Sequence, residues 1–352
     1  MSDDMREALA GQGRACARFG SAFSAALLER AAQAAGATPA LDRLLSPWDG
    51  MSTDELFAAA VPLRLLGALH ELTLTGEAPA LTAAYPAAER PGDADAAWAE
   101  ALEELASQEQ RLAAFMAHEP QTNEVRRSAA LLGGFLTIAR ETGLPLRTFE
   151  LGASAGLNLV FDAFAYRLGE IGSWGDQGSG LTLETSWRGP PPPLEAALRV
   201  VARAACDRRP ARLADEAARH RLRAYIWPDQ AERLAAFEAA VAIARTKGVT
   251  VEAADAADFV ASRAAPQPGL ATIVYHSIVW QYLGPESQAA LLAAIEAQGG
   301  RASAEAPFAW LRLEPAAGAP FPIELRATFW PGGEQRLLAR AHPHGAWVEW
   351  LG

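Results

Sequence analysis

The sequence lacks several features that mark particular classes of protein. Its two cysteines, Cys16 and Cys206, fit neither a metal nor a redox spacing, so we expect both to be reduced core thiols. No apolar run reaches the roughly eighteen residues of a membrane-spanning helix. The acidic N-terminus has no signal-peptide pattern. We therefore expect a cytoplasmic protein that does not enter a membrane.

Positive charge is also in short supply. The chain has a single lysine, Lys247, and a formal net charge of −11. This balance disfavours a dedicated nucleic-acid binder, because such proteins neutralise phosphates with a basic surface. His342-Pro343-His344 offers two metal-binding nitrogens, but no cysteine or carboxylate cluster completes a zinc set. We expect no metal, and a small molecule as the binding partner.

Helical periodicity dominates the first part of the chain. Apolar residues recur at helical spacing from Leu9 to Leu27, and Ser52 and Glu55 form the pattern of a capping box. The region 79–95 carries three prolines and predicts a loop. A helix is expected at 98–118, and another is expected to begin after Thr122 and to end at Gly143. We predict an all-helical N-terminal domain at 1–144.

The period changes at residue 145. Short apolar segments alternate with helical ones, which predicts a mostly parallel α/β sheet of the Rossmann-like kind at 145–352. Residues 169–193 are rich in glycine and proline and are expected to be an insertion. An antiparallel pair, 322–330 and 335–350, should close the sheet at its edge. The parallel strands are expected at these segments: 146–151, 198–206, 249–253, 271–275 and 307–313.

Four polar residues fall at the predicted carboxyl ends of these strands. They are Glu150, Asp207, Asp255 and His276. In open α/β sheets, ligands bind outside the carboxyl ends of the strands. The first strand is followed by the loop Gly152-Ala153-Ser154-Ala155-Gly156, whose glycines permit a tight turn and whose N–H groups can face a ligand. The sequence therefore predicts a small-molecule site at this loop.

This arrangement resembles the class I S-adenosylmethionine-dependent methyltransferases. The resemblance implies that S-adenosylmethionine is the cofactor, that Asp207 binds its ribose, and that Asp255 and Ala256 lie near its adenine. It also implies that His276 follows the fourth strand, where it is a candidate base. Ser154 replaces the middle glycine of the family's loop, and Asp207 follows that loop at an unusually long distance. The cofactor-binding residues expected on this basis are Glu150, Gly152, Ala153, Ser154, Gly156, Asn158, Asp207, Asp255 and Ala256.

Nearly the whole chain also resembles an uncharacterised bacterial family, which implies no activity. The segments that carry this resemblance are 66–70, 121–128, 152–159, 227–230, 276–277 and 344–347. The polar segment 121–127 is expected to pack over the glycine loop and to supply the substrate side of the pocket. Trp227 is expected at the rim. The substrate-binding residues expected are Gln121, Glu124, Arg127, Trp227 and Asp229.

The same loop permits another interpretation. Gly152-Ala153-Ser154-Ala155-Gly156 also fits Gly-x-Ser-x-Gly, the nucleophile elbow of α/β-hydrolases. Ser154 would then be the nucleophile, Asp255 would orient the base, and His276 or His344 would be that base. Only one predicted strand precedes the elbow, which disfavours a serine esterase. The structural alternative is that Ser154 caps the following helix. A non-catalytic protein that binds an adenosyl ligand also stays open.

Overall fold

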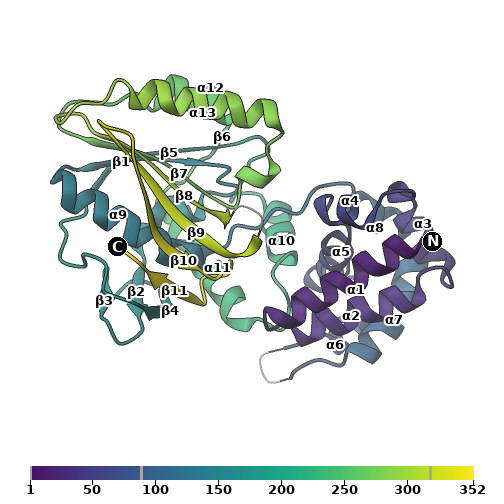
Figure 1. Ribbon diagram of the computed structural model, residues 1–352. Helices are drawn as coiled ribbons and strands as arrows, with labels where there is room; N and C mark the ends of the chain where they lie inside the picture. Colours follow the sequence, from purple (N-terminus) through teal and green to yellow (C-terminus); the bar gives the residue numbers. More distant parts are fainter. Residues whose placement is uncertain (1, 88–89, 317–318) are drawn as a thin grey trace. The chain divides into compact units, whose positions relative to one another are not determined.

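The structure, a computed structural model, describes residues 2–87, 90–316 and 319–352. The chain divides into two compact units (Figure 1). The helical unit comprises Met1–Thr122 and Asp215–Ala235, and the sheet unit comprises Asn123–Ala214 and Ala236–Gly352. This division differs from the expected boundary at 144/145, because residues 215–235 belong with the helices and residues 123–144 with the sheet.

The helical unit is held by an apolar core from every one of its longer helices. Leu9, Leu28, Leu41 and Leu69 are among its fully buried residues. The capping box at Ser52 and Glu55 is confirmed. The helices wholly in this unit are α1 (Asp3–Arg18), α2 (Ala22–Ala34), α3 (Pro39–Leu45), α4 (Thr53–Ala58), α5 (Val61–Thr75), α6 (Pro79–Ala84), α7 (Ala94–Ser107), α8 (Glu109–Met116) and α10 (Glu216–Ala224), with the 3-10 turn η1 (Ser46–Trp48).

Two expectations for this unit are wrong in detail. The predicted loop at 79–95 begins with α6, because Pro79 stands in the first turn, where a missing N–H costs no hydrogen bond. The predicted single helix at 98–118 is two helices, α7 and α8, which meet at Gln108. Among the described residues before β1, the only strand-like feature is an isolated bridge between Ala87 and Arg90.

The five expected parallel strands are confirmed. They are β1 (Leu146–Leu151), β5 (Val200–Asp207), β6 (Glu252–Ala253), β7 (Ala271–Ser277) and β8 (Phe308–Ala316). Their order across the sheet is β6-β5-β1-β7-β8, and every neighbouring pair is parallel. This is the order 3-2-1-4-5 of doubly wound sheets, in which the order reverses beside the first strand. That reversal lies between β1 and β7.

An antiparallel edge continues the sheet beyond β8. It contains β9 (Ala319–Trp330), β10 (Glu334–Ala341) and β11 (Trp347–Trp350). The region 169–193 is not a separate insertion: its β4 (Thr182–Arg188) pairs with β11, and β2 (Ala165–Leu168) and β3 (Ser173–Trp174) extend the sheet further. Alternating burial along β4 suits a strand with one face on a core.

Helices cover both faces of the parallel part. In Figure 1, α9 (Ser128–Thr142) lies on one side of the sheet, and α12 (Ala256–Arg263) and α13 (Pro285–Gly299) lie on the other. The ring of Phe135 in α9 packs edge-on against Tyr275 of β7, 5.0 Å between centroids. Val274 belongs to the core formed with α12 and α13. Successive β7 residues therefore face opposite layers, which separates Tyr275 from His276.

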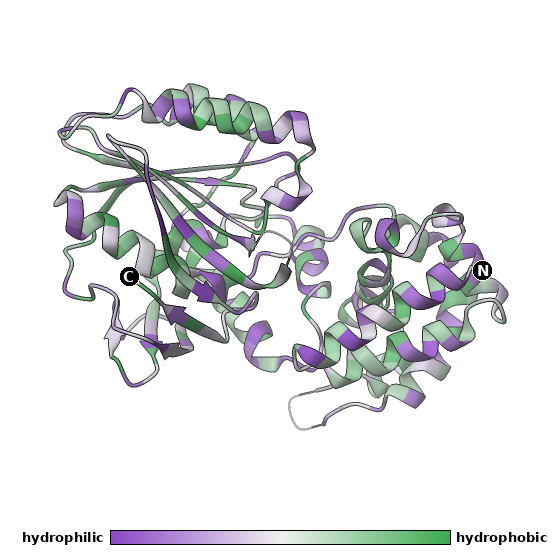
Figure 2. Ribbon diagram, in the orientation of Figure 1, coloured by the Kyte–Doolittle hydropathy of each residue, from purple (hydrophilic) through white to green (hydrophobic). Residues whose placement is uncertain are grey.

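The remaining elements of the sheet unit are short turns and one shared helix. The turns are η2 (Val125–Arg127), η3 (Leu157–Ala163) and η4 (Trp280–Tyr282). α11 (Ala231–Thr246) begins in the helical unit and ends in the sheet unit. Figure 2 shows hydrophobic and hydrophilic stretches side by side on α12 and α13, as expected of helices with one buried face. Gly143 ends α9 in the left-handed conformation, as predicted.

Candidate functional site

The glycine loop connects β1 to η3 at the point where the strand order reverses. Gly152, Ser154 and Gly156 all have positive φ angles, of 60°, 54° and 74°. A Cβ added at Gly152 would lie 2.5 Å from Val279 Cγ2, and one added at Gly156 would lie 2.7 Å from Val249 Cγ1. Glycine is therefore required at both positions for two reasons: the backbone has a positive φ, and a valine side chain approaches closely.

Asp207 fastens this loop to the end of β5. Its Oδ2 accepts the Ser154 N–H at 2.9 Å, and its Oδ1 accepts the Arg209 N–H at 2.8 Å. A further bond, from the Ala211 N–H to the Ser154 carbonyl at 3.1 Å, ties the two segments together. Asp207 therefore lies at the loop, as the sequence predicted, and its visible task is to hold the loop's backbone. The expected contact with a ribose stays a prediction.

Asp255 and Ala256 mark the beginning of α12. Asp255 is the N-cap, and its Oδ1 accepts the Ala257 N–H at 2.9 Å. Its Oδ2 lies 3.3 Å from the Arg208 guanidinium, and both side chains are partly exposed. These contacts give Asp255 a capping role. The adenine contact expected of Asp255 and Ala256 stays a prediction.

Glu150 is the most perturbed carboxyl group of the site. It is buried at the end of β1, and its Oε2 accepts a hydrogen bond from the Tyr275 hydroxyl at 3.2 Å. Burial raises the pKa of Glu150 to about 8, the Tyr275 bond opposes this rise, and the negative charge of Asp207 adds to it. A carboxyl group that titrates near neutral pH at the switch point of the sheet is a candidate functional group.

Two buried polar atoms of the glycine loop and η3 have no hydrogen-bond partner among the described residues. They are Oδ1 of Asn158 and Oγ of Ser154. Asn158 donates through Nδ2 to the Glu124 carbonyl at 3.2 Å, and its own carbonyl lies 3.4 Å from the Tyr275 hydroxyl. Unsatisfied buried acceptors are costly, so each calls for an explanation such as a water or a ligand. We refer to Glu150, Ser154, Asn158 and Tyr275 as the β1 polar cluster.

Ser154 lacks the partner that a nucleophilic serine needs. Its positive φ is compatible with a strained elbow, but its hydroxyl is buried and bonds to no histidine in the part of the chain that the structure describes. The capping role expected as an alternative is also absent, because the Leu157 N–H donates to Asn123 Oδ1 at 2.9 Å instead. Asn123 thus performs the task for which Ser154 was a candidate.

His276 is enclosed on the opposite face of the sheet. Its Nε2 accepts from the Trp310 indole N–H at 3.1 Å, so its Nδ1 carries the proton and donates to Glu314 Oε1 at 2.6 Å. The ring is fully buried and stacks on Trp280 at 6.2 Å. Both nitrogens are occupied, so in this arrangement the ring is not available as a base. The position at the end of β7 is as expected, and the role is a structural one.

Glu314 also shapes the loop after β7. The same Oε1 accepts the N–H groups of Val279 and Trp280 at 2.9 and 3.3 Å. These bonds follow Ile278, whose φ of 53° lies in the left-handed region that β-branched residues rarely adopt. The result places Val279 against Gly152. His276 and Glu314 therefore act on the glycine loop indirectly, through the segment 277–280.

The polar segment 123–127 lies against the glycine loop, as expected. Asn123 and Glu124 contact residues 157 and 158 through the two bonds given above. Glu124 is buried and caps η2, where its Oε1 accepts the Arg126 N–H at 3.2 Å. Arg127 donates to the carbonyls of Pro343 and Ser277 at 2.9 and 3.3 Å. This segment joins three loops, and its substrate-binding role stays a prediction.

Gln121, Trp227 and Asp229 belong to the helical unit. Asp229 accepts hydrogen bonds from the Ser21 hydroxyl at 2.5 Å and from the Phe23 N–H at 2.9 Å, so it caps the beginning of α2. Trp227 is buried, and the Arg233 guanidinium lies over its ring, 5.8 Å from the centroid. These contacts of Trp227 and Asp229 lie within this unit, and a substrate role for the three residues stays a prediction.

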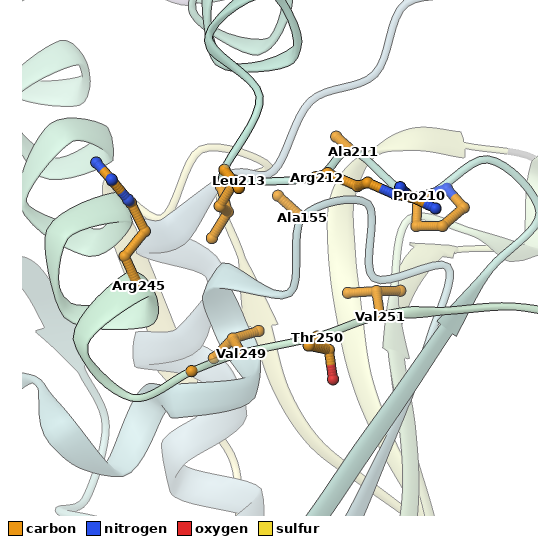
Figure 3. A pocket seen from close by; sticks show the side chains of 11 residues that line it. Ala155, Pro210, Ala211, Arg212, Leu213, Arg245, Val249, Thr250 and Val251 are labelled. Atoms are coloured by element: carbon orange, nitrogen blue, oxygen red, sulfur yellow. The ribbon is translucent and has the colours of Figure 1, made fainter.

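A cavity of about 450 Å³ lies beside Ala155 of the glycine loop (Figure 3). Its walls come from the segment after β5 and from the segment between α11 and β6. The lining residues are Ala155, Pro210, Ala211, Arg212, Leu213, Ala214, Arg245, Gly248, Val249, Thr250 and Val251. This volume suits a small organic ligand. The carboxyl groups of Glu150, Asp207 and Asp255 are not part of the lining.

The sequence reasoning missed several residues of this region. Tyr275 and Asn123 contact the predicted site directly, and Val279 and Glu314 shape it from the next loop. Tyr275 was detectable in principle, because alternation along a buried strand places it opposite His276. Glu314 was not, because its partners come from a loop whose path depends on a left-handed isoleucine.

Among the described residues, no group of three or more His, Cys, Asp or Glu side chains is arranged to hold a metal ion. Cys16 and Cys206 are buried and free, as expected. Within the same residues, none of the helices has the length and apolarity needed to cross a bilayer.

Comparison with known proteins gives one match. Neither the curated proteins nor the solved structures contain a match to this chain. A family model matches residues 6–350, which is nearly the whole sequence and spans both units. The model's family has no described activity. The chain therefore belongs to the family of uncharacterized proteins conserved in bacteria (DUF2332).

Proposed function

We propose that the sheet unit binds S-adenosylmethionine at the glycine loop and transfers its methyl group to a small or peptide-like acceptor. The observation that carries the proposal is the β1 polar cluster. It combines a glycine loop at the switch point of a 3-2-1-4-5 sheet with a buried carboxyl group and unsatisfied acceptors. Ligands of open α/β sheets bind at this point of the topology.

The residues present fit such a ligand in their chemistry. Glu150 and the unpartnered Oδ1 of Asn158 are acceptors that an ammonium group would satisfy. Ser154 Oγ is a second unpartnered atom, which can accept or donate. Acidic and neutral acceptors favour a ligand with a positive charge and a diol over the pyrophosphate of a dinucleotide, which they would repel. This is why we rank S-adenosylmethionine above NAD.

The chain's own contribution would be binding and positioning. Glu150 would hold the ammonium group, and Asp207 would keep the glycine loop in place through the Ser154 N–H. Val279 covers Gly152, so the segment 277–280 would exclude water from the loop. The bound cofactor supplies the electrophilic methyl group. Because both nitrogens of His276 are occupied, proximity and orientation carry this proposal rather than base catalysis by that ring.

The test is direct binding measured by isothermal titration calorimetry. We expect S-adenosylhomocysteine to bind the native chain with a Kd in the micromolar range and NAD not to bind. Glu150→Gln should weaken the adenosyl ligand about tenfold or more, because a charge-assisted hydrogen bond is replaced by a neutral one. Glu184→Gln, at an exposed ion pair with Arg167, is the matched control and should bind like the native chain.

Two results would change the proposal. If neither adenosyl compound binds at millimolar concentration, the proposal is wrong. If S-adenosylhomocysteine binds but no acceptor panel yields methylated product, the chain is a non-catalytic adenosyl-ligand-binding protein. In both cases the fold and the family membership stand.

A further inference from the structure

The cavity beside Ala155 has an apolar wall. Ala155, Leu213, Val249 and Val251 supply methyl groups to it, and Figure 3 shows Leu213 directed toward Val249. The wall is held from behind by backbone hydrogen bonds, from Ala211 N–H to Ser154 O at 3.1 Å and from Val249 N–H to Ala244 O at 3.0 Å. An apolar body that enters this space would lose contact with water and gain packing.

The polar groups of the cavity are cationic. Arg212 and Arg245 are exposed side chains on its lining, and neither has a hydrogen bond or an ion pair with any residue that the structure describes. Elsewhere arginines meet carboxylates, as Arg43 meets Glu109 and Arg203 meets Asp162. None of the described lining residues is acidic, and Thr250 contributes the single side-chain oxygen.

Two guanidinium groups without a carboxylate partner among the described residues, in an acidic protein, indicate a site that can bind an anion. The chain carries a formal charge of −11, so acidic partners for surface arginines are plentiful. Guanidinium groups bind carboxylates and phosphates with two parallel hydrogen bonds. Lys247, the single lysine, follows Arg245 by two residues and adds positive charge to the same segment.

We propose that this cavity binds a small ligand with an apolar body and one anionic group, a carboxylate or a phosphate monoester. The apolar body occupies the space between Leu213 and Val249, and the anion meets Arg212 or Arg245 at the lining. The site is distinct from the β1 polar cluster, because no carboxyl group of that cluster lines the cavity. The inference therefore goes beyond the proposed methyl transfer and does not depend on it.

Fluorescence of an anionic aromatic probe tests the proposal. 1-Anilinonaphthalene-8-sulfonate carries an apolar ring system and one anion, and N-phenyl-1-naphthylamine is the same body without the charge. We expect the sulfonate to bind the native, folded chain at one site, about tenfold more tightly than the neutral compound. Equal affinity for the two probes would overturn the proposal.

Variants locate the bound probe. Arg212→Ala combined with Arg245→Ala should weaken the sulfonate about tenfold and leave the neutral compound unchanged. Arg140→Ala, an exposed arginine in α9, is the matched control and should have no effect. Thr250→Asp should weaken the sulfonate through charge repulsion, whereas Thr250→Ala should not. All four side chains are exposed, so these changes should leave the fold intact. Binding that is insensitive to both the arginine pair and Thr250→Asp would overturn the site.

Competition distinguishes the two kinds of anion. Decanoate and decyl phosphate share an apolar chain, and decanol is the neutral reference. We expect one or both anions to displace the sulfonate at concentrations about tenfold lower than decanol, and the more potent anion identifies the class. Decanol as potent as the anions contradicts the proposal. Displacement by S-adenosylhomocysteine in a manner independent of both arginines would show that the cavity belongs to the adenosyl ligand, which refutes this inference and supports the proposed function.

Discussion

Tyr275 and His276 are neighbours in β7, and each contacts a glutamate, but the two glutamates differ in how many hydrogen bonds they accept. On the His276 face, both ring nitrogens are bonded, and Glu314 Oε1 accepts three hydrogen bonds, while Glu314 Oε2 is buried and accepts none from the described residues. On the Tyr275 face, Glu150 accepts one described bond, and Asn158 Oδ1 and Ser154 Oγ accept none.

This difference supports the proposal that a ligand binds on the Tyr275 face. A histidine at the end of a strand is the obvious candidate base, yet its bonds are already made, so its task is to hold the segment 277–280. The glutamate with the raised pKa and the unpartnered neighbours lies on the other face. Perturbed titration together with incomplete bonding is the combination found at functional sites.

The largest expected effect is the change in the free energy of unfolding with pH that the titration of Glu150 produces. The pKa of Glu150 is about 8 in the folded chain, against an ordinary value of 4.5 for an exposed glutamate. Between these values the folded state keeps a proton that the unfolded state has lost, so stability falls as pH rises from about 4.5 to about 8. The loss amounts to at most about 5 kcal/mol. Urea unfolding of the native chain and of Glu150→Gln at several pH values measures it.

The glutamine variant should lack this fall, because it has no proton to release. His70 in the helical unit acts in the opposite sense: burial lowers its pKa to about 4, so its contribution is lost as pH falls from about 6.5 to about 4. The window from pH 6.5 to 8 therefore isolates Glu150. Native and variant chains with equal slopes in that window would contradict the raised pKa.

The next effect concerns the His276 face. His276→Ala removes two hydrogen bonds, leaves the Trp310 N–H without its acceptor, takes one of three donors from Glu314 Oε1 and opens a cavity, so we expect it to lower the free energy of unfolding by about 3 kcal/mol. His118→Ala, at an exposed position, should change it by less than about 0.5 kcal/mol. Chemical denaturation measures both. A loss as small as that of the control would show that the two hydrogen bonds of His276 do not stabilise the fold.

A smaller effect on the free energy of unfolding is expected on the Tyr275 face. Tyr275→Phe removes the one described donor to Glu150 and should lower the free energy of unfolding by about 1 kcal/mol. Because that bond lowers the pKa of Glu150, the variant should also move the midpoint of the pH dependence upward. The same unfolding series measures both changes. A downward shift would mean that Tyr275 does not stabilise the ionised carboxylate.

The smallest expected effect is the absence of a reaction at Ser154. Its hydroxyl is buried and bonds to no base among the residues that the structure describes, so a fluorophosphonate probe should not label the native chain. Mass spectrometry of the treated protein checks this, with Ser154→Ala as the reference. A covalent adduct on Ser154 would revive the serine-esterase interpretation.

The parallel sheet was accessible from the sequence because its strands are short apolar segments between strong breakers. The beginnings of β1, β7 and β8 lie within one residue of the expected positions. The strand expected at 249–253 shrinks to β6, since Val249 and Val251 are used to pack the glycine loop instead. The local sequence pattern does not show that these valines pack against the glycine loop rather than extend the strand.

The candidate site was predictable in its location but not in its bonding. The sequence predicted Glu150, Asp207 and His276 at one edge of the sheet, and the strands place all three at carboxyl ends. It did not reveal which of these side chains would already be hydrogen-bonded to other residues of the chain. Those contacts come from Trp310, Glu314 and the Ser154 N–H, which lie far away along the chain or depend on a left-handed turn.

The central claim is that Glu150 receives the ammonium group of an adenosyl ligand, and proton release on binding tests it most directly. At pH 7 a carboxyl group with a pKa near 8 is mostly protonated, and a bound cation would ionise it. Calorimetric titration of S-adenosylhomocysteine in two buffers of different ionisation enthalpy should therefore show release of a large fraction of one proton from the native chain and none from Glu150→Gln. Binding without proton release, or equal release from both chains, would contradict the claim.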